Sequence, residues 1–423
     1  MALGDYDNLM VQYLEDAFPR VLTINHPFLD RISKKKETGR QVAFPVSMGP
    51  GGGGSTSFST ALTNASSVGG VVAQWQISPQ RRYGIVTFNT DDNAFTTGPE
   101  SAISAMENTT KNAMILAMQT FGGRLGLFSD GYGSLATIDV ATNTSGNLWQ
   151  ITFVSPSDVW NFRNEQILTQ KTTAAGSTLD NSGATGKVID VDQVGNSTLG
   201  PSITIDVGVG GLVPTAAHFL GEAGTQAAST SVVTFAGLPA WCPAWTSRPL
   251  SGTFNNVVRG TFGVASDGFA IDGRGRPIND AINALASNMA NLENSQGLNL
   301  GVCNPVTLGK IAAAFDTKSR SDYRAKGDPD VYFTGITITT PAGTIEMFPE
   351  PGCPTNQVFL TNGDNWVFGT PTGGNPFRPG ASFDGRMFVQ DYASPQARCS
   401  VACQGFLYPL DLAAVGNVLI STT

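Results

Sequence analysis

The sequence predicts an α+β fold with two or three domains, and three observations lead to that prediction. A chain of 423 residues can bury a large core and is long enough for several domains. Many apolar segments are short, rich in β-branched and aromatic residues, and bounded by Gly, Asn or Ser, which is typical of strands. A few other segments place apolar residues at helical spacing.

The N-terminal segment, residues 5–21, is predicted to be an amphipathic helix. Its apolar side chains fall on one stripe, formed by Leu9, Met10, Tyr13, Leu14, Ala17, Phe18 and Leu22. The helix either docks on its own domain or acts as an arm that docks on a neighbouring chain, and the residues favour neither interpretation.

Residues 36–92 are predicted to form a long two-stranded excursion. One strand is "QVAFPVSM", in which Pro45 marks an edge position. The other is "GVVAQWQISP" followed by "RRYGIVTFNT". The tip between the strands has too little apolar content to fold by itself, so something outside must support it.

Four consecutive glycines at this tip run into Ser55 and Thr56, like a phosphate-binding loop. That type of loop also needs a lysine, and a helix directly after it. No lysine lies between Lys36 and Lys111, and residues 58–70 show little helical periodicity. The sequence therefore favours a mobile loop tip over a nucleotide site.

The longest predicted helix covers residues 97–122. Thr97 is its candidate cap, Pro99 lies near its first position, Glu100 is in its first turn, and Gly122 ends it. A long helix directly after a long hairpin is expected to organise the fold.

A small β-barrel or sandwich is predicted next, because residues 135–215 contain five short strands separated by polar turns. Asp139, Asp190 and Asp206 alternate with apolar residues in these strands. Such acids are either calcium ligands or, more often, the solvent-facing side of the strands.

The second half of the chain predicts a helix over 277–293 and a buried strand, "LNLGVC", followed by a helix that Asn304 caps and Pro305 opens. Hairpins are predicted around Pro341–Gly343 and around Asn362–Gly363. The last residues contain two or three further strands.

Charged residues make up 14% of the chain, against about 25% in ordinary soluble proteins. Such a surface suits extensive contact between copies, because association cores are depleted in charge. The net charge is −8. A protein that grips nucleic acid through phosphates is normally basic, so this chain could only enclose nucleic acid without gripping it.

No motif predicts catalysis. The five cysteines are odd in number and widely spread, which favours reduced thiols, and His26 and His218 are isolated. We expect no catalytic residue, no cofactor and no metal site. Neither a signal peptide nor a run of about 18 apolar residues is evident, so we expect no export and no membrane span.

The order of these elements resembles the major capsid protein of tailed bacteriophages, with the Hong Kong 97-type fold. "KETGRQVAFPVSM" with "GVVAQWQISPQRRYGIVTF" looks like that family's extended loop, and "PESAISAMENTTKNAMILAMQTFGG" like its spine helix. "INDAINALASNMANLE", "VCNPVTLGKIAAAF" and "GITITTPAGTIEMFPEPGCPTNQVFLTNGDNWVF" resemble its axial domain. "AHFLGEAGTQ" and "GLPAWCPAW" resemble segments that close an inserted β-module.

The resemblance implies a division of the chain. An N-terminal arm covers residues 1–35 and an extended β-hairpin loop covers 36–96. The peripheral domain, with the spine helix and long strands, combines 97–125 with 384–423. The axial domain covers 126–383, with the inserted β-module at about 135–225.

The resemblance also implies a structural function: a shell subunit that forms hexamers and pentamers of an icosahedral head around double-stranded DNA, assembled in the host cytoplasm. Scaffolding, portal and decoration proteins are the partners it suggests. The alternative is an encapsulin-like compartment that encloses a cargo enzyme. A secreted β-rich binding module and a hydrolase of unfamiliar type are further readings, which the missing signal peptide and the missing motifs disfavour.

Assembly contacts are expected from the arm, the loop tip, the loop base and the start of the spine helix: Tyr13, Phe18, Gly51, Gly52, Gly53, Gly54, Arg81, Arg82 and Glu100. Arg81 and Arg82 are adjacent on a strand and point to opposite faces, so at most one can face the packed side of its own hairpin. The alternative is that both arginines are simply solvated.

Residues 41–93 contain no lysine. Relatives that weld their shells covalently join a lysine of the extended loop to an asparagine of a neighbour. That weld is not available at this loop, so we expect the shell to be held by non-covalent contacts.

Overall fold

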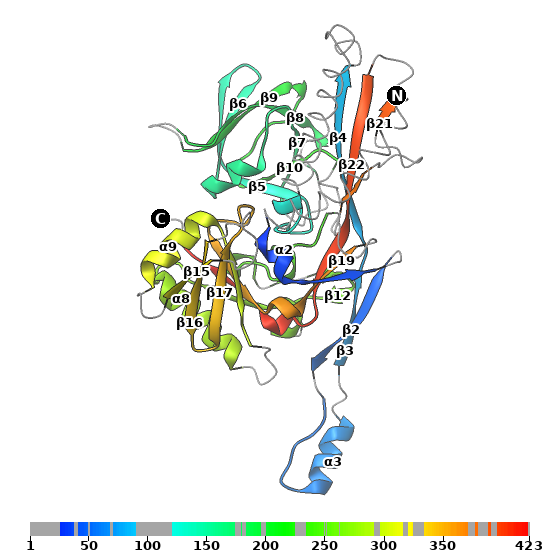
Figure 1. The fold of residues 1–423 in the computed structure, drawn as a ribbon. Helices are drawn as coiled ribbons and strands as arrows, with labels where there is room; N and C mark the ends of the chain where they lie inside the picture. The colour runs from blue at the N-terminus through cyan, green and yellow to red at the C-terminus, as the bar shows by residue number, and fades with distance from the viewer. Residues whose placement is uncertain are drawn as a thin grey trace.

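The computed structural model describes residues 26–37, 41–49, 51–67, 71–89, 121–173, 179, 183–195, 200–224, 234–248, 250, 252–261, 263–291, 297–315, 320–324, 334–370, 377–379, 388–390 and 396–421. The described chain has a body made of two sheets with an aromatic core between them, a small barrel above the body, and a hairpin that projects from it (Figure 1). The projecting hairpin carries the candidate assembly surface.

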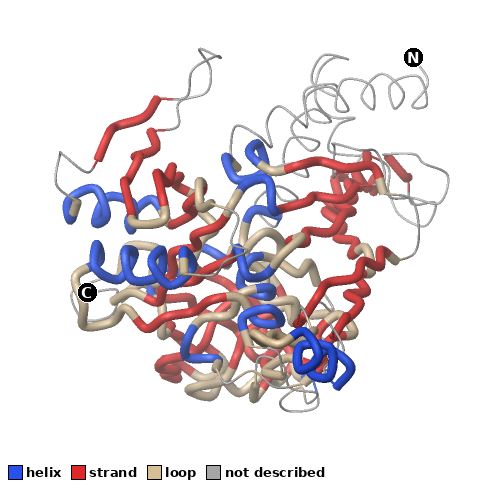
Figure 2. The backbone as a smooth tube through the Cα atoms, turned by 90° about the horizontal axis from the view of Figure 1, so that it is seen from below, coloured by secondary structure: helices blue, strands red, loops and turns tan. Residues whose placement is uncertain are grey.

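A seven-stranded sheet with two helices forms one half of the body. Its strand order is β13 (Phe269–Asp272), β23 (Val415–Leu419), β18 (Gln357–Thr361), β14 (Leu300–Cys303), β17 (Gly343–Pro349), β16 (Thr334–Thr340) and β15 (Arg320–Arg324). The helices α8 (Ile278–Ala290) and α9 (Pro305–Ala314) lie side by side against it (Figure 2). Val358 and Leu360 pack with the helices, whereas Phe359 between them packs into the aromatic core, as the two-residue period of a strand requires.

The predicted strand–Asn–Pro–helix unit is confirmed. The Asn304 Oδ1 atom accepts the Val306 N–H at 3.0 Å, and Pro305 is the first residue of α9. The Asn304 amide also donates to the Cys353 carbonyl at 2.9 Å, which ties the start of the helix to the chain beyond β17. The predicted helix at 277–293 is α8, with Ile282, Leu285 and Met289 buried.

A six-stranded sheet forms the other half of the body, built around the long strand β22 (Gln396–Pro409). The first part of β22 pairs with β4 (Gln80–Asn89), β20 (Phe377–Pro379) and β21 (Phe388–Gln390). Its last part pairs with β19 (Trp366–Thr370), and β1 (Ser33–Lys36) adds to β19 in parallel. The strand β22 therefore runs from the body into an upright ribbon with β4 (Figure 1).

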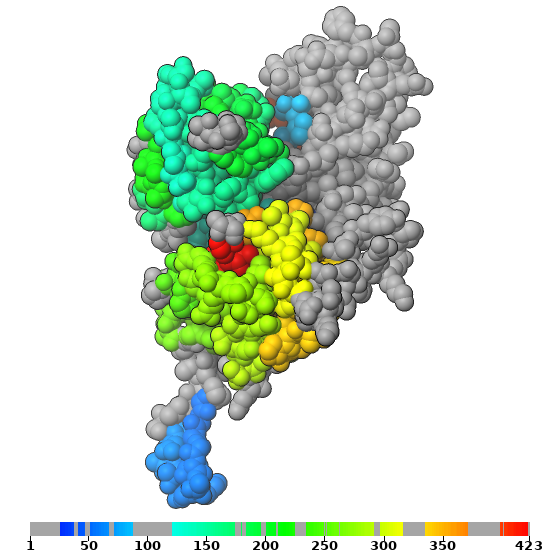
Figure 3. Space-filling view, turned by 90° about the vertical axis from the view of Figure 1, so that its left-hand side faces the viewer, coloured from blue at the N-terminus to red at the C-terminus, as the bar shows by residue number. Residues whose placement is uncertain are grey.

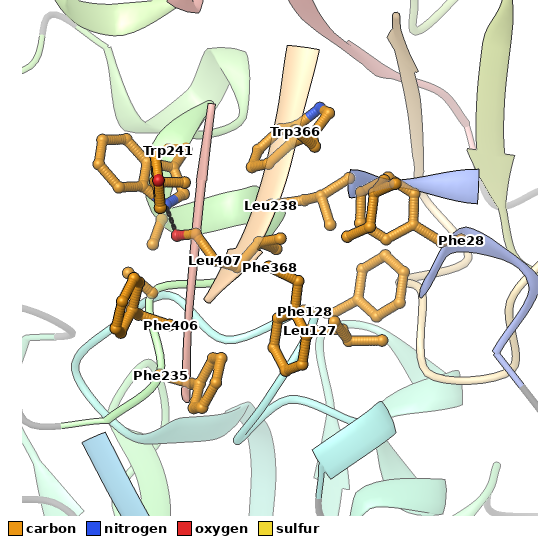
Figure 4. Close-up of a cluster of buried hydrophobic side chains, with 14 of the residues drawn as sticks. Phe28, Leu127, Phe128, Phe235, Leu238, Trp241, Trp366, Phe368, Phe406 and Leu407 are labelled. Atoms are coloured by element: carbon orange, nitrogen blue, oxygen red, sulfur yellow. Dashed lines mark hydrogen bonds between the residues drawn. The ribbon is translucent and has the colours of Figure 1, made fainter. Parts of the chain in front are cut away.

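The core between the sheets is aromatic (Figure 4). Phe28 of the short helix α2 (Pro27–Arg31) meets Trp366 edge to face at 5.9 Å between ring centroids. Trp241 of α6 (Leu238–Trp241) donates its indole N–H to the Leu407 carbonyl at 2.8 Å. This bond satisfies the polar atom of a fully buried ring. Two small elements complete the body here, α7 (Val264–Asp267) and the two-stranded unit β11 (Thr253–Phe254) and β12 (Val257–Val258).

The predicted β-module is a closed six-stranded barrel. Its strands close in the order β10 (Phe219–Glu222), β5 (Ser134–Ser145), β6 (Leu148–Phe153), β9 (Ser202–Gly210), β8 (Thr185–Asp192) and β7 (Ile167–Lys171). The 3₁₀ helix η1 (Pro156–Asn161) follows β6. Apolar side chains fill the interior, among them Ile138, Ile151, Leu168 and Ile205, all fully buried.

Two predicted hairpins and the C-terminal strands, all in the second half of the chain, can be compared with the structure. The hairpin around Pro341–Gly343 is confirmed, since Thr340 pairs with Gly343. The hairpin around Asn362–Gly363 is wrong, because β18 belongs to the seven-stranded sheet and β19 to the six-stranded sheet. The C-terminal strand β23 also lies in the seven-stranded sheet, not with the long ribbon strand β22.

Two side-chain caps explain the missing turn at Asn362–Gly363. The Asn362 side chain accepts the Asp364 N–H at 3.0 Å, and the Gly363 N–H donates to Asn299 Oδ1 at 2.9 Å. Neither Asn362 nor Gly363 has the positive φ that a two-residue type I′ turn requires. The chain therefore passes through the 3₁₀ helix η4 (Gly363–Asn365) into the other sheet.

The predicted helix of the arm, residues 5–21, lies outside the described residues, whereas the end of the arm contains α2 and most of β1. Almost all of the predicted spine helix also lies outside them. Its exceptions are Phe121 and Gly122, which are helical, after which a turn begins at Gly123. This agrees with Gly122 as the end of the helix.

Candidate assembly surface

The hairpin of β2 (Val42–Gly49) and β3 (Val71–Ile77) is anchored to the body at its base. Trp75 and Ile77 are buried, and Trp75 meets Trp241 edge to face at 5.1 Å. On the other strand, Phe44 stacks on Tyr408 of β22 at 4.9 Å. One face of the hairpin base therefore belongs to the aromatic core.

The predicted loop covers residues 36–96, but the observed hairpin consists of β2 and β3 alone and does not include β4. The strand β4 pairs with β22 along its whole length and not with β2, so the excursion itself ends at Ile77. The break falls at Ser78–Pro79, where proline cannot donate to a ladder. The residues predicted as the second side of the loop therefore form two strands: β3, which pairs with β2, and β4, which pairs with β22.

The tip of the hairpin is a helix, which corrects the expectation of little helical periodicity after the glycines. The helix α3 (Phe58–Ser67) contains Phe58 and Leu62 four residues apart, on one face. Most of its other residues are Ser, Thr and Asn, which are weak helix formers and obscured the pattern. Two hydroxyls return to the helix backbone, Thr63 to the Ser59 carbonyl and Ser66 to the Thr63 carbonyl.

The glycines of the tip have different structural roles. Gly51 and Gly52 have φ of 62° and 90°, a conformation that favours glycine. Gly53 packs directly on α3, because a Cβ there would lie 2.4 Å from the Ala65 backbone nitrogen. Gly54 has open space around its Cα. The first three glycines therefore shape the turn into α3, and the fourth does not.

The tip exposes apolar side chains and carries no charge. Phe58 is 84% exposed, Leu62 61% and Val72 67%. Residues 41–80 contain no Asp, Glu, Lys, Arg or His. The tip stands clear of the described part of the body (Figure 3), and none of the described residues covers these side chains. An uncharged, projecting surface with exposed aromatic and aliphatic residues has the composition of an interface core rather than of a solvated surface.

Arg81 and Arg82 at the start of β4 point to opposite faces, as predicted for adjacent residues of a strand. Arg82 forms an ion pair with Glu222 of the barrel, and Arg163 donates to the same carboxylate at 3.2 Å. Arg82 therefore holds the ribbon to the barrel within one chain, and its contact with another chain stays a prediction. Arg81 is exposed and remains a predicted contact.

Three other expected contact residues, Tyr13, Phe18 and Glu100, lie outside the described residues. Of the expected set, the structure describes the four glycines and the two arginines. The glycines lie at the tip of the hairpin and the arginines lie beyond its base, on β4, so the structure does not bring them together. The residues that sequence reasoning missed are Phe58 and Leu62. Their i, i+4 spacing is the signal that could have found them.

The cysteines, the possible metal ligands and one cavity are the features of the described residues that bear on catalysis. All five cysteines are buried and none forms a disulfide, and burial raises the pKa of Cys242 to about 12. No group of three or more His, Cys, Asp or Glu side chains that could hold a metal ion occurs among the described residues. A cavity of about 310 Å³ at the hairpin base, lined by residues such as Gln76, Phe235 and Asn255, has no titratable side chain in its wall. Within the described part of the chain, no helix is both long and apolar enough to cross a membrane.

Comparisons with known proteins give structural matches alone. No family model matches the chain, and no curated protein does. The capsid of cyanophage A-1(L) matches 94% of this chain and 93% of its own, with a TM-score of 0.49 and 10% identity. The chain is similar to phage capsid proteins.

Two other solved structures, a second capsid and an encapsulin, are also similar to this chain. The capsid of a native GTA particle matches 95% of this chain and 91% of its own, with a TM-score of 0.40 and 10% identity. The SrpI encapsulin of Synechococcus elongatus matches 94% of this chain and 88% of its own, with a TM-score of 0.36 and 8% identity. Similarities of this size carry no conclusion about function by themselves.

Proposed function

We propose that this chain is the major capsid protein of a tailed phage, a structural subunit that assembles into the hexamers and pentamers of an icosahedral head around double-stranded DNA. The observation that carries the proposal is the projecting, uncharged hairpin tip with Phe58 and Leu62 exposed. A subunit that worked alone would leave this apolar surface in water.

The energetic gain from covering the tip supports assembly. Fully burying a Phe or Leu side chain contributes about 1.5–3 kcal/mol. Phe58 and Leu62 together therefore offer several kcal/mol per subunit when a partner covers them. Because the same contact repeats around a closed shell, even a modest gain per copy stabilises the assembly.

The position of the tip favours rings of identical subunits. The hairpin base is fixed in the aromatic core, so the tip cannot fold back onto its own body without giving up the contacts of Trp75 and Phe44. The partner surface is therefore on another chain. A contact between two different surfaces of identical chains is head-to-tail, and such contacts close into rings when the rotation permits.

The alternative function is the shell of an encapsulin-like compartment that encloses a cargo enzyme. The barrel inserted between Ser134 and Glu222 and the long hairpin favour the phage head. The two functions differ in contents, since one shell holds double-stranded DNA and the other holds protein.

Electron microscopy of the purified, expressed chain tests the proposal. We expect closed shells or rings of five and six subunits, and nuclease-protected DNA in particles purified from an infected host. Particles that hold protein cargo and no DNA would support the compartment. A monodisperse monomer at all concentrations would contradict both.

The absence of lysine from residues 41–93 leads to a second test of the shell. Mature particles boiled in detergent with reductant should run as one band near 44.3 kDa, because no weld through this loop can form. A ladder of covalent multimers after that treatment would contradict a shell held only by non-covalent contacts.

A further inference from the structure

We propose that the hairpin tip of one subunit docks on the outer face of β4 of the next subunit, with α3 antiparallel to the strand. The contact presupposes the proposed function and names the surface of the next subunit that receives the tip. This surface is the pair Tyr83 and Ile85, called the β4 stripe below. Leu62 of one copy lies over Tyr83 of the next copy, and Phe58 lies over Ile85.

The β4 stripe faces away from its own subunit. Arg82 pairs with Glu222 on the barrel side of β4, and the strand keeps a regular register with β22, so its odd-numbered residues point to the opposite face. On that face Tyr83 is 51% exposed and Ile85 54%. Among the described residues, no other two exposed large apolar side chains lie two positions apart on one strand. The stripe is therefore a concentrated apolar surface.

The tip and the β4 stripe lie at opposite ends of the subunit. The ribbon of β4 and β22 rises from one end of the body, and the hairpin with α3 projects from the other (Figure 1). One chain therefore cannot bring its own tip to its own stripe while Trp75 at the hairpin base stays packed on Trp241. Complementary surfaces at opposite ends of identical chains make a head-to-tail contact, which closes into a ring when the rotation permits.

The spacing of the two apolar pairs matches. Residues four apart on a helix have Cβ atoms about 5–6 Å apart. Residues two apart on a strand are separated by about 6.8 Å. Phe58 and Leu62 can therefore cover Ile85 and Tyr83 at the same time. Because residues 41–80 contain no Asp, Glu, Lys, Arg or His, the tip buries no charge of its own when it covers the stripe.

Arg81 decides the orientation of the helix, because it is exposed and precedes the stripe on the same face of β4. The carboxyl end of a helix carries a partial negative charge that a cation stabilises, and the last turn of α3 has no basic side chain of its own. Leu62 lies five residues before the end of α3, a distance of about 7.5 Å. Arg81 lies two residues before Tyr83, a distance of about 6.8 Å. With Leu62 over Tyr83, the end of α3 therefore reaches Arg81.

Disulfide trapping in assembled particles tests the contact. After oxidation with diamide, particles of the double variant Phe58→Cys/Ile85→Cys should run as a ladder of covalent multimers on a non-reducing gel. Reductant should return them to one band near 44.3 kDa. A disulfide needs Cβ atoms about 3.5–4.5 Å apart, so it forms only between residues in direct contact. Leu62→Cys/Tyr83→Cys is a second pair that should give the same ladder, and it keeps the test decisive if the first variant does not assemble.

Phe58→Cys/Val140→Cys is the matched control, because Val140 is 50% exposed on the barrel. It should form particles without a ladder. The crossed pair Phe58→Cys/Tyr83→Cys should link much less than either matched pair, since its partners are about 6.8 Å out of register. A crossed pair that links better than the matched pairs would overturn the antiparallel arrangement.

The outcomes separate this contact from the proposed function. Normal particles of both matched pairs without a ladder would overturn the β4 stripe as the receiving surface and would leave the proposed function standing. A dimer band from Phe58→Cys alone would show that two tips meet each other and would overturn the contact as well. If the unsubstituted chain formed no particles, the proposed function would be contradicted, and the contact with it.

Discussion

The base and the tip of the β2–β3 hairpin belong to one continuous excursion but meet opposite surroundings. At the base, Trp75 is 1% exposed and packs on Trp241. At the tip, Phe58 is 84% exposed. Both rings are large and apolar, and the same chain places one in a core and the other in water. The difference shows that the base is stabilised by its own subunit, and it supports our proposal that another subunit covers the tip.

This comparison separates folding from assembly. Substitutions at the base should change the free energy of unfolding of the subunit. Substitutions at the tip should change the assembly and leave that free energy nearly unaltered. Each prediction below tests one side of this division, from the largest expected effect on the subunit to the smallest.

Trp75→Ala should lower the free energy of unfolding by about 3–5 kcal/mol, since it leaves a cavity beside Trp241 and Phe254. Urea unfolding of the dissociated subunit measures it. Val72→Ala on the same strand is the control, because Val72 is 67% exposed and its loss should cost less than about 0.5 kcal/mol. Equal losses for the two variants would remove the distinction between base and tip.

The buried thiols of the body should make the subunit less stable in alkali. Burial raises the pKa of Cys242 to about 12 from an ordinary value of 9.0, and raises the pKa of Cys303, Cys353 and Cys403 as well. The folded state therefore keeps protons that the unfolded chain loses. The contribution of these thiols to the free energy of unfolding is therefore complete below pH 9.0. Above pH 9.0 the free energy of unfolding falls by up to about 1.4 kcal/mol per thiol and pH unit.

Urea unfolding under reducing conditions between pH 7 and 10.5 measures this effect. The tip contributes nothing to it, because residues 41–80 have no titratable side chain of the Asp, Glu, His, Lys, Arg or Cys type. Deleting residues 51–57 should leave the alkaline fall in place. A free energy that stays flat to pH 10.5 would be incompatible with thiols buried in the core.

Arg82→Ala should lower the free energy of unfolding by about 1–2 kcal/mol, because it removes a partly buried partner of Glu222 and loosens the barrel from the ribbon. Arg81→Ala is its neighbour and control, with an expected change within about 0.5 kcal/mol. Thermal unfolding of the two single variants decides between them. An Arg81→Ala subunit that is the less stable of the two would mean that the faces of β4 are assigned the wrong way round.

Tip substitutions should have the smallest effect on the subunit and the largest on the shell. Phe58→Ala combined with Leu62→Ala should change the free energy of unfolding by less than about 0.5 kcal/mol and should lower the yield of particles in sedimentation. Gly53→Ala should also lower the yield, because its Cβ meets α3, whereas Gly54→Ala should not. Normal particle yield from the double variant would argue against a clamping tip.

The sequence predicted best where local chemistry decides the outcome. The cap at Asn304, the proline that opens α9, and the turn between Thr340 and Gly343 depend on neighbours in sequence. The barrel was also predictable, because regular short strands with polar turns have few other solutions.

The failures have physical causes of two kinds. Asn362–Gly363 has the composition of a hairpin turn, yet contacts with Asn299, more than sixty residues away, hold the chain in another path. The two-residue turn with positive φ is found instead at Asn255–Asn256, between β11 and β12. The ion pair of Arg82 with Glu222 was not foreseen either, because Glu222 lies 140 residues along the chain and no local pattern could reveal it. The helix at the tip was missed because its polar residues hid a single apolar pair.

The central claim is that another subunit covers the hairpin tip, and a cysteine placed at position 58 tests it most directly. All five native cysteines are buried, so Phe58→Cys adds one reactive thiol. In the dissociated subunit this thiol should react with a maleimide at the rate of a free peptide thiol. In assembled particles it should react at least 100-fold more slowly, while the chain without the added cysteine stays unlabelled in both. Equal rates in the subunit and the particle would contradict the claim.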